Sequence, residues 1–235
     1  PRSLTVTGYA EFTNHPNYEQ DQVNLQYSLF ITKTRFDQNR VTQLIHGNLD
    51  SLPEEEQVDN KNVTERFFGL AGANVSSWCG DKAEFIGRYH GYADPQGVID
   101  GDLKNIASYN ENSCGAISCQ IDLQPGETKN IAFLLGECPG AEAEEILAEY
   151  QDSAFATAKE LAALKDDWNS KLSHLQVNTP SPAFNTMINT WNAYNCFMTF
   201  TWSRAASLIY CGLRNGYGYR DTVQDIQGVI HLAPQ

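Results

Sequence analysis

The chain has 235 residues, 41% of them hydrophobic and 19% charged, as expected for one or two globular domains. Its 16 basic against 29 acidic residues give a formal net charge of −13. This balance argues against nucleic acid or an anionic membrane as the main partner, because both require a positive surface. No apolar run approaches the roughly 20 residues that span a bilayer, and the start has no signal-peptide layout. We therefore expect no membrane partner, and we interpret both ends as cuts through a longer protein.

The six cysteines form no CxxC pair and have no close histidine partner, so a zinc site is not expected. Some lie in apolar surroundings, as Cys119 does between Ile117 and Ile121, where a free thiol behaves as a small hydrophobic side chain. We interpret all six as reduced and the protein as cytoplasmic, without a metal or cofactor. They are Cys79, Cys114, Cys119, Cys138, Cys196 and Cys211.

Residues 1–140 repeatedly alternate apolar and polar side chains, which is typical of half-buried strands. Because the polar connections between these stretches are long, the pattern predicts a large antiparallel β-sandwich. The predicted strands are 4–12, 25–31, 66–70, 84–89, 117–123 and 131–136.

The composition changes abruptly after Cys138-Pro139-Gly140. From Ala141 to Leu175 there is no proline or glycine, and apolar residues recur in steps of three and four, which predicts one long helix or two joined helices with a single apolar face. A further helix is predicted to start with Ser181 at the N-cap and Pro182 in the first turn. Because it is aromatic on most sides, we expect it to pack inside a multi-helix assembly.

The segment Arg214–Gly228 combines two arginines, two aspartates and two tyrosines with three glycines, the last of which ends it. Such a density of charge excludes a buried strand, because unpaired charges are costly to bury. Gly216 and Gly218 weaken helix formation, so we predict a loop that leads into a helix with Asp221 at its N-cap. Aromatic rings beside guanidinium and carboxylate groups suit a sugar site. A buried Arg–Asp network at a domain joint is the alternative.

The stretch from Gly218 to Asp225, Gly-Tyr-Arg-Asp-Thr-Val-Gln-Asp, matches the pattern Gly, aromatic, Arg, Asp, two variable residues, Gln, Asp. With the order of predicted domains, it makes the chain resemble glycoside hydrolase family 94, the inverting disaccharide phosphorylases. The resemblance implies a β-sandwich at 1–140, a helical linker at 141–178 and the first helices of a truncated (α/α)6 catalytic barrel at 179–235.

The resemblance also implies roles for residues of this segment. Asp221 and an arginine, for which Arg214 and Arg220 are the candidates, would bind the non-reducing sugar. Tyr219, Gln224 and Asp225 would support them from behind. The general acid of the family lies further along the barrel, so no catalytic residue is expected in this chain. The N-terminus of a helix lowers the pKa of a carboxylate, which argues against Asp221 as that acid.

The implied reaction cleaves a β-1,4-linked disaccharide of the cello type with inorganic phosphate as co-substrate. It yields an α-sugar 1-phosphate and a free sugar, and the family resemblance further implies a homodimer. The alternatives are a chitobiose-type phosphorylase, an (α/α)6 glycoside hydrolase that uses water, and a non-catalytic carbohydrate-binding β-sandwich.

Overall fold

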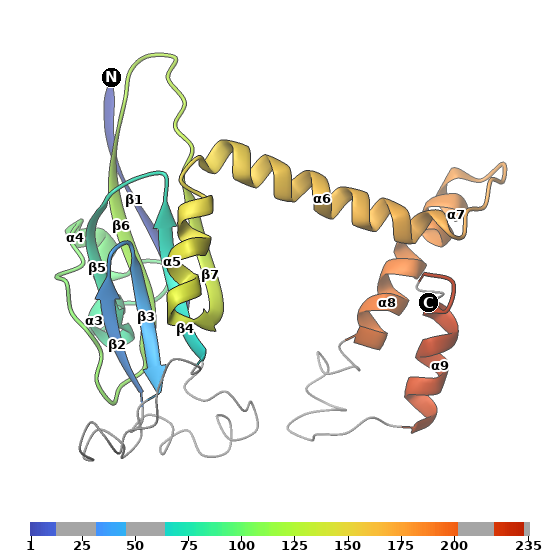
Figure 1. The fold of residues 1–235 in the computed structure, drawn as a ribbon, viewed down its shortest axis with the longest axis horizontal. Helices are drawn as coiled ribbons and strands as arrows, with labels where there is room; N and C mark the ends of the chain where they lie inside the picture. Colours follow the sequence, from blue (N-terminus) through green and yellow to red (C-terminus); the bar gives the residue numbers. More distant parts are fainter. Residues whose placement is uncertain (13–31, 46–63, 202–218, 233–235) are drawn as a thin grey trace. The chain divides into compact units, whose positions relative to one another are not determined.

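The computed structural model describes residues 1–12, 32–45, 64–201 and 219–232. They fall into two compact units, Pro1–Ala158 and Lys159–Gln235, and the division lies within a long helix (Figure 1). In the described part of the chain, no helix is both long and apolar enough to cross a membrane. The predicted strand at 25–31 lies outside the described residues.

The first unit contains two antiparallel sheets (Figure 1). The three-stranded sheet has the order β1-β6-β5, and the four-stranded sheet has the order β2-β3-β4-β7. The strands are β1 Arg2–Glu11, β2 Thr32–Asp37, β3 Arg40–Ile45, β4 Thr64–Ala71, β5 Val75–Asp81, β6 Ser113–Leu123 and β7 Ala132–Pro139.

The main core lies between the two sheets, where alternate residues of each strand meet. Phe68 and Leu70 from one sheet pack with Ile117 and Cys119 from the other. Gly8 is required for this fit, because a Cβ there would lie 2.5 Å from Cδ1 of Phe133. The predicted sandwich is therefore confirmed for the described strands.

Each sheet is also covered on its outer face. The segment that joins β5 to β6 carries α3 (Lys82–Ile86) and α4 (Gln96–Asp100), and its Phe85 and Leu103 pack on the outer side of the three-stranded sheet. Helix α5 (Gly140–Glu149) covers the four-stranded sheet, with Leu147 above Gly69. We call residues 82–112 the excursion.

The strand predicted at 84–89 is wrong, because this part of the excursion begins with the short helix α3. The carboxylate of Asp81 accepts a hydrogen bond from the amide of Glu84 at 3.0 Å and so caps the helix. Gly87 ends it with a φ of 84°, and Phe85 is buried. Local capping thus overrides the apolar pattern that suggested a strand.

The second unit is helical. Over 141–175 we predicted one long helix or two joined helices, and the structure has two. They are α5, in the first unit, and α6, which continues into the second. The apolar face predicted along them is not fully buried, since Leu161 and Leu164 of α6 are 51% and 55% exposed. Ser181 caps α7 as predicted, and its Oγ accepts a hydrogen bond from the amide of Phe184. The helices are α6 Ser153–Ser173, α7 Pro182–Thr186, the π-helix η4 Met187–Asn192, α8 Ala193–Thr201 and α9 Tyr219–Val229.

Candidate functional site

The predicted sugar-binding segment leads into helix α9. The helix begins at Tyr219, so Asp221 lies in its first turn and is not the N-cap that we predicted. The two glycines that weaken helix formation both precede Tyr219, and neither Tyr219 nor Arg220 opposes helix. The helix therefore starts earlier than the cap argument suggests. Arg214 lies outside the described residues.

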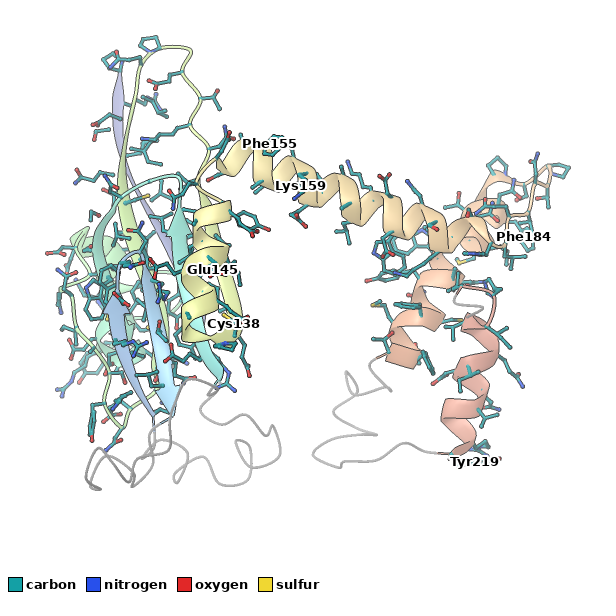
Figure 2. The ribbon with its side chains drawn as sticks, in the orientation of Figure 1. Cys138, Glu145, Phe155, Lys159, Phe184 and Tyr219 are labelled. Atoms are coloured by element: carbon teal, nitrogen blue, oxygen red, sulfur yellow. The ribbon has the colours of Figure 1, made fainter. Side chains whose placement is uncertain are left out.

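Five of the six predicted site residues share the first two turns of α9. Tyr219 is 86% exposed at the N-terminal end of the helix (Figure 2). Arg220 and Gln224 are also exposed, whereas Asp225 is half-buried and has an interaction partner. The helix thus presents an aromatic ring, a guanidinium group and an amide to solvent at one end.

The other end of α9 is anchored on α8. Val229 and Leu232 pack with Ala193, and partly buried Cys196 joins them. The two helices approach closely, because a Cβ on Gly228 would lie 2.6 Å from Sγ of Cys196. The C-terminal end of α9 is thus packed on α8, whereas most of the described side chains in its N-terminal turns, which carry predicted site residues, are exposed.

Helix α8 is in turn held against the C-terminal part of α6 by an aromatic cluster. The ring of Trp168 lies 5.4 Å from that of Tyr194 and 5.6 Å, edge to face, from that of Phe197. The ammonium group of Lys171 lies 5.5 Å from the centre of the Phe197 ring. Aromatic pairs and cation–π contacts of this kind each stabilise packing by about 0.5–1.5 kcal/mol.

The residue types in these first turns suit binding better than acid–base catalysis. Within α8 and α9 the carboxylates are Asp221 and Asp225, which are four residues apart on one helix. Residues at that spacing are neighbours on the same face, about 5–6 Å apart at Cβ. They cannot approach a glycosidic bond from opposite faces of a sugar, as the acid and base of an inverting hydrolase do. Arg220 and the helix N-terminus instead favour contacts with hydroxyl groups or an anion.

Two family models match this chain. The Glycosyl hydrolase 94 supersandwich domain matches residues 1–153, and the Glycosyl hydrolase 94 superfamily catalytic domain matches residues 167–235. The first match alone covers more than half of the chain. The chain belongs to glycoside hydrolase family 94. The resemblance inferred from Gly218–Asp225 is thereby confirmed, and the segment lies inside the catalytic-domain match.

Curated relatives agree with this family. The chain is 33% identical over 234 residues to an N,N′-diacetylchitobiose phosphorylase of Vibrio furnissii and 33% identical over 235 residues to one of Vibrio proteolyticus. All of this chain is aligned, but it spans only 28% of the length of each of these relatives. A cyclic β-(1,2)-glucan synthase of Rhizobium meliloti is 30% identical over 161 residues, which are 68% of this chain and 6% of that protein.

The supersandwich domain of this family 94 chain also holds a polar cluster that the sequence did not reveal. The carboxylate of Glu11 accepts hydrogen bonds from the hydroxyl groups of Tyr9 (2.9 Å) and Tyr92 (2.6 Å) and from Lys82 (3.0 Å). Partial burial raises the pKa of Glu11, but these hydrogen bonds outweigh it and lower the pKa below its ordinary value of 4.5. No local pattern could have predicted the cluster, since Lys82 lies 71 positions from Glu11.

A groove of about 450 Å³ runs along β7 beside α5 and α6 in the same domain. Its lining is mostly apolar, with Leu135 on one side and Ile146 and Tyr150 on the other. Figure 2 shows β7 and α5 adjacent where Cys138, another lining residue, is labelled. The lining lacks the arginine that a sugar or phosphate would favour, so this groove is a weaker candidate for a sugar site than the first turns of α9.

Proposed function

We propose that this chain is part of an inverting phosphorylase. The enzyme cleaves a β-1,4-linked disaccharide with inorganic phosphate and releases an α-sugar 1-phosphate and a free sugar. The observation that carries the proposal is the Gly218–Asp225 motif, which lies inside the catalytic-domain match and, from Tyr219 on, within α9. The same match disfavours a carbohydrate-binding sandwich without a catalytic domain.

The chemistry of the proposed reaction is a single displacement. A carboxylic acid protonates the glycosidic oxygen while phosphate attacks the anomeric carbon from the opposite face, which inverts the configuration. Phosphate is already an anionic nucleophile, so the reaction needs no general base. We assign the acid to a residue outside this chain.

In this proposal, the first turns of α9 hold the non-reducing sugar. Asp221 accepts hydrogen bonds from sugar hydroxyl groups, and Arg220 or Arg214 donates to them. Tyr219, Gln224 and Asp225 support these groups. The exposed guanidinium of Arg220 and the anchoring of α9 on α8 are consistent with this assignment. Anchoring of the helix helps to position the bound sugar, and small errors in the position of a substrate reduce the reaction rate strongly.

Two disaccharides fit the proposal. Cellobiose is the substrate that the motif first suggested, and N,N′-diacetylchitobiose has the same β-1,4 linkage. The names of the two Vibrio relatives favour the second. The two sugars differ by the acetamido group at C2, so the pocket around that carbon decides between them.

We further propose that α7, η4, α8 and α9 begin an (α/α)6 barrel and that the enzyme is a homodimer. Exposed apolar side chains recur along α9 at Val223 and Ile226, which are 42% and 40% exposed, and just beyond it at Ile230, which is 66% exposed. Apolar surface on one face of a helix is usually covered by neighbouring elements. Further barrel helices would provide that cover.

The test is to incubate the full-length protein with each disaccharide, with and without inorganic phosphate. The proposal expects cleavage only with phosphate, and NMR should identify the product as the α-anomer of the sugar 1-phosphate. Equal sugar release without phosphate would instead identify an (α/α)6 hydrolase. A β-configured sugar phosphate would contradict the single displacement.

A further inference from the structure

Two buried cysteines lie side by side on adjacent strands of the supersandwich. Cys79 is in β5 and Cys114 in β6, and the register pairs Cys79 with Ala116, so all three share the outer face of the sheet. The register shifts between Cys79 and Asp81, next to this pair. The thiol of Cys114 contacts the carbonyl oxygen of Cys79 at 3.7 Å. The two side chains are 1% and 0% exposed.

These two cysteines stand where the excursion leaves and rejoins the sheet. The amide of Lys82 donates to the carbonyl oxygen of Asn112 at 3.0 Å, which closes the neck of the excursion just beyond the two thiols. Phe85 and Leu103, both from the excursion, pack in the same cluster as Cys79 and Cys114. The thiols therefore lie directly beneath the excursion and are covered by it.

The two thiols are chemically unequal. A hydrogen bond from Cys114 lowers the pKa of Cys79, although burial opposes this, and the same hydrogen bond together with burial raises the pKa of Cys114. In Cys119 and Cys138, by contrast, burial raises the pKa. The thiol of Cys79 itself contacts the carbonyl oxygen of Asp81 at 3.2 Å. Of the two thiols, Cys79 has the lower pKa and is therefore the better nucleophile.

We propose that Cys79 and Cys114 form a redox pair that closes to a disulfide under peroxide and staples the neck of the excursion. The thiolate of Cys79 attacks one oxygen of hydrogen peroxide, which gives a sulfenic acid and releases hydroxide. The sulfur of Cys114 then attacks the sulfenic sulfur, so that an S–S bond forms and water leaves with the Cys114 proton. Two thiols lose two electrons, and one peroxide becomes two waters.

The reaction requires the excursion to lift, because both sulfur atoms are covered when it is closed. Opening is opposed by backbone hydrogen bonds that tie the excursion to the strands, among them Gly80 to Ile106 at 2.7 Å and Thr34 to Ser108 at 2.9 Å, so the oxidation should be slow. Once formed, the disulfide constrains the whole excursion and limits further opening. The disulfide therefore forms only when the excursion opens in the presence of an oxidant, and it then keeps the excursion closed.

The experiment treats the full-length protein with hydrogen peroxide, blocks remaining thiols in denaturant with N-ethylmaleimide, and maps peptides by mass spectrometry. The expected product is a peptide pair joined through Cys79 and Cys114, lighter by two hydrogens and absent after reduction. Cys79→Ser and Cys114→Ser should each abolish it, while the control Cys119→Ser should leave it unchanged.

Two results in the unmodified protein would overturn the proposal, so it does not depend on the variants folding. In the first, both cysteines remain fully alkylated while exposed methionines are oxidised. In the second, Cys79 proceeds to a sulfinic acid without any cross-link to Cys114. Neither readout depends on phosphorylase activity.

Discussion

Two asparagines four residues apart hold the extended chain that leads into α7. The amide group of Asn189 accepts a hydrogen bond from the nitrogen of Val177 at 2.8 Å and donates to its carbonyl oxygen at 2.9 Å. Asn185 makes the same pair of bonds with Thr179, at 2.9 and 3.0 Å. Each side-chain amide thus bonds both the N–H and the C=O of one residue, as a neighbouring β-strand would. These bonds fix the path of the chain before α7.

Asn189→Asp should destabilise the full-length protein, because a carboxylate cannot donate to the carbonyl oxygen of Val177. A part-buried carbonyl that loses its partner costs about 1–3 kcal/mol. The measurement is urea unfolding followed by tryptophan fluorescence. Asn192→Asp is the matched control, since Asn192 lies exposed in the same π-helix. Equal loss of stability in both variants would show that the paired bonds at Asn189 contribute nothing specific.

Residue-scale features could be predicted where their partners are close in sequence. Ser181 was predicted as an N-cap because its partner, the amide of Phe184, lies three residues away. The Asn189 pair escaped prediction because Val177 lies 12 positions away and outside any helix. The start of α9 was misplaced by the cap argument at Asp221, since nothing local forbids helix at Tyr219.

At the scale of elements, the α8–α9 contact connects packing to the candidate site. Gly228 lets α9 approach α8 closely, and its position is two turns beyond Asp221 along the same helix. A side chain at Gly228 would meet both Cβ and Sγ of Cys196, at 2.8 and 2.6 Å. A substitution at Gly228 that pushes α9 away from α8 should therefore also displace the first turns of α9.

Gly228→Ala should therefore destabilise the full-length protein, although alanine favours helix. Overpacking of this kind costs about 1–3 kcal/mol, which exceeds the helix-propensity gain of up to about 1 kcal/mol. The melting temperature and kcat/KM should fall together. Gln227→Ala, at the exposed neighbouring position, should leave both unchanged. A Gly228→Ala protein that is more stable than the parent would mean that the two helices do not pack this closely.

The cluster around Glu11 ties the excursion to β1. Lys82 lies at the start of α3 and Tyr92 further along the excursion, and both donate to the Glu11 carboxylate. The pKa of Glu11 is lowered by hydrogen bonds that outweigh burial, so its contribution to stability is present above pH 4.5 and lost as the pH falls through the lower folded value. The hydrogen bond with Tyr92 raises the pKa of Lys82, although burial opposes this, so the lysine side of the cluster stays charged throughout this range.

Glu11→Gln should lower the melting temperature at pH 7, and the difference from the parent should shrink as the pH falls below 4.5 and the native carboxylate becomes protonated. Thermal unfolding across pH 3–8 measures it. Glu149→Gln, at an exposed position on α5, serves as control and should show no such pH dependence. A difference that grows on acidification would reverse the sign and contradict the assignment.

Element-scale prediction succeeded where one periodicity dominates. The alternation at 117–123 and the apolar run at 131–136 correspond to β6 and β7. It failed at 84–89, where a capping aspartate makes a helix of an apolar stretch. It also did not show that the apolar face of α6 is partly exposed, because periodicity shows which residues align but not whether a neighbour covers them.

At the scale of the whole molecule, the sandwich and the candidate site belong to different units and different family matches. The family could be predicted from the sequence because its motif is contiguous, from Gly218 to Asp225. The substrate could not, because nothing in this motif distinguishes glucose from N-acetylglucosamine, and the chain spans only 28% of the length of its Vibrio relatives. The central claim therefore has to be tested on the complete polypeptide.

The most direct test is the kcat/KM of phosphorolysis for Asp221→Asn in the full-length enzyme. Hydrogen bonds to a charged group are worth about 1.5–3 kcal/mol, so we expect kcat/KM to fall by about 10- to 150-fold while the melting temperature is unchanged. Asp166→Asn, at an exposed position in the same unit, should leave both unchanged. Unaltered kinetics in Asp221→Asn, or a fall explained by a lower melting temperature, would contradict a sugar-binding role for the first turns of α9.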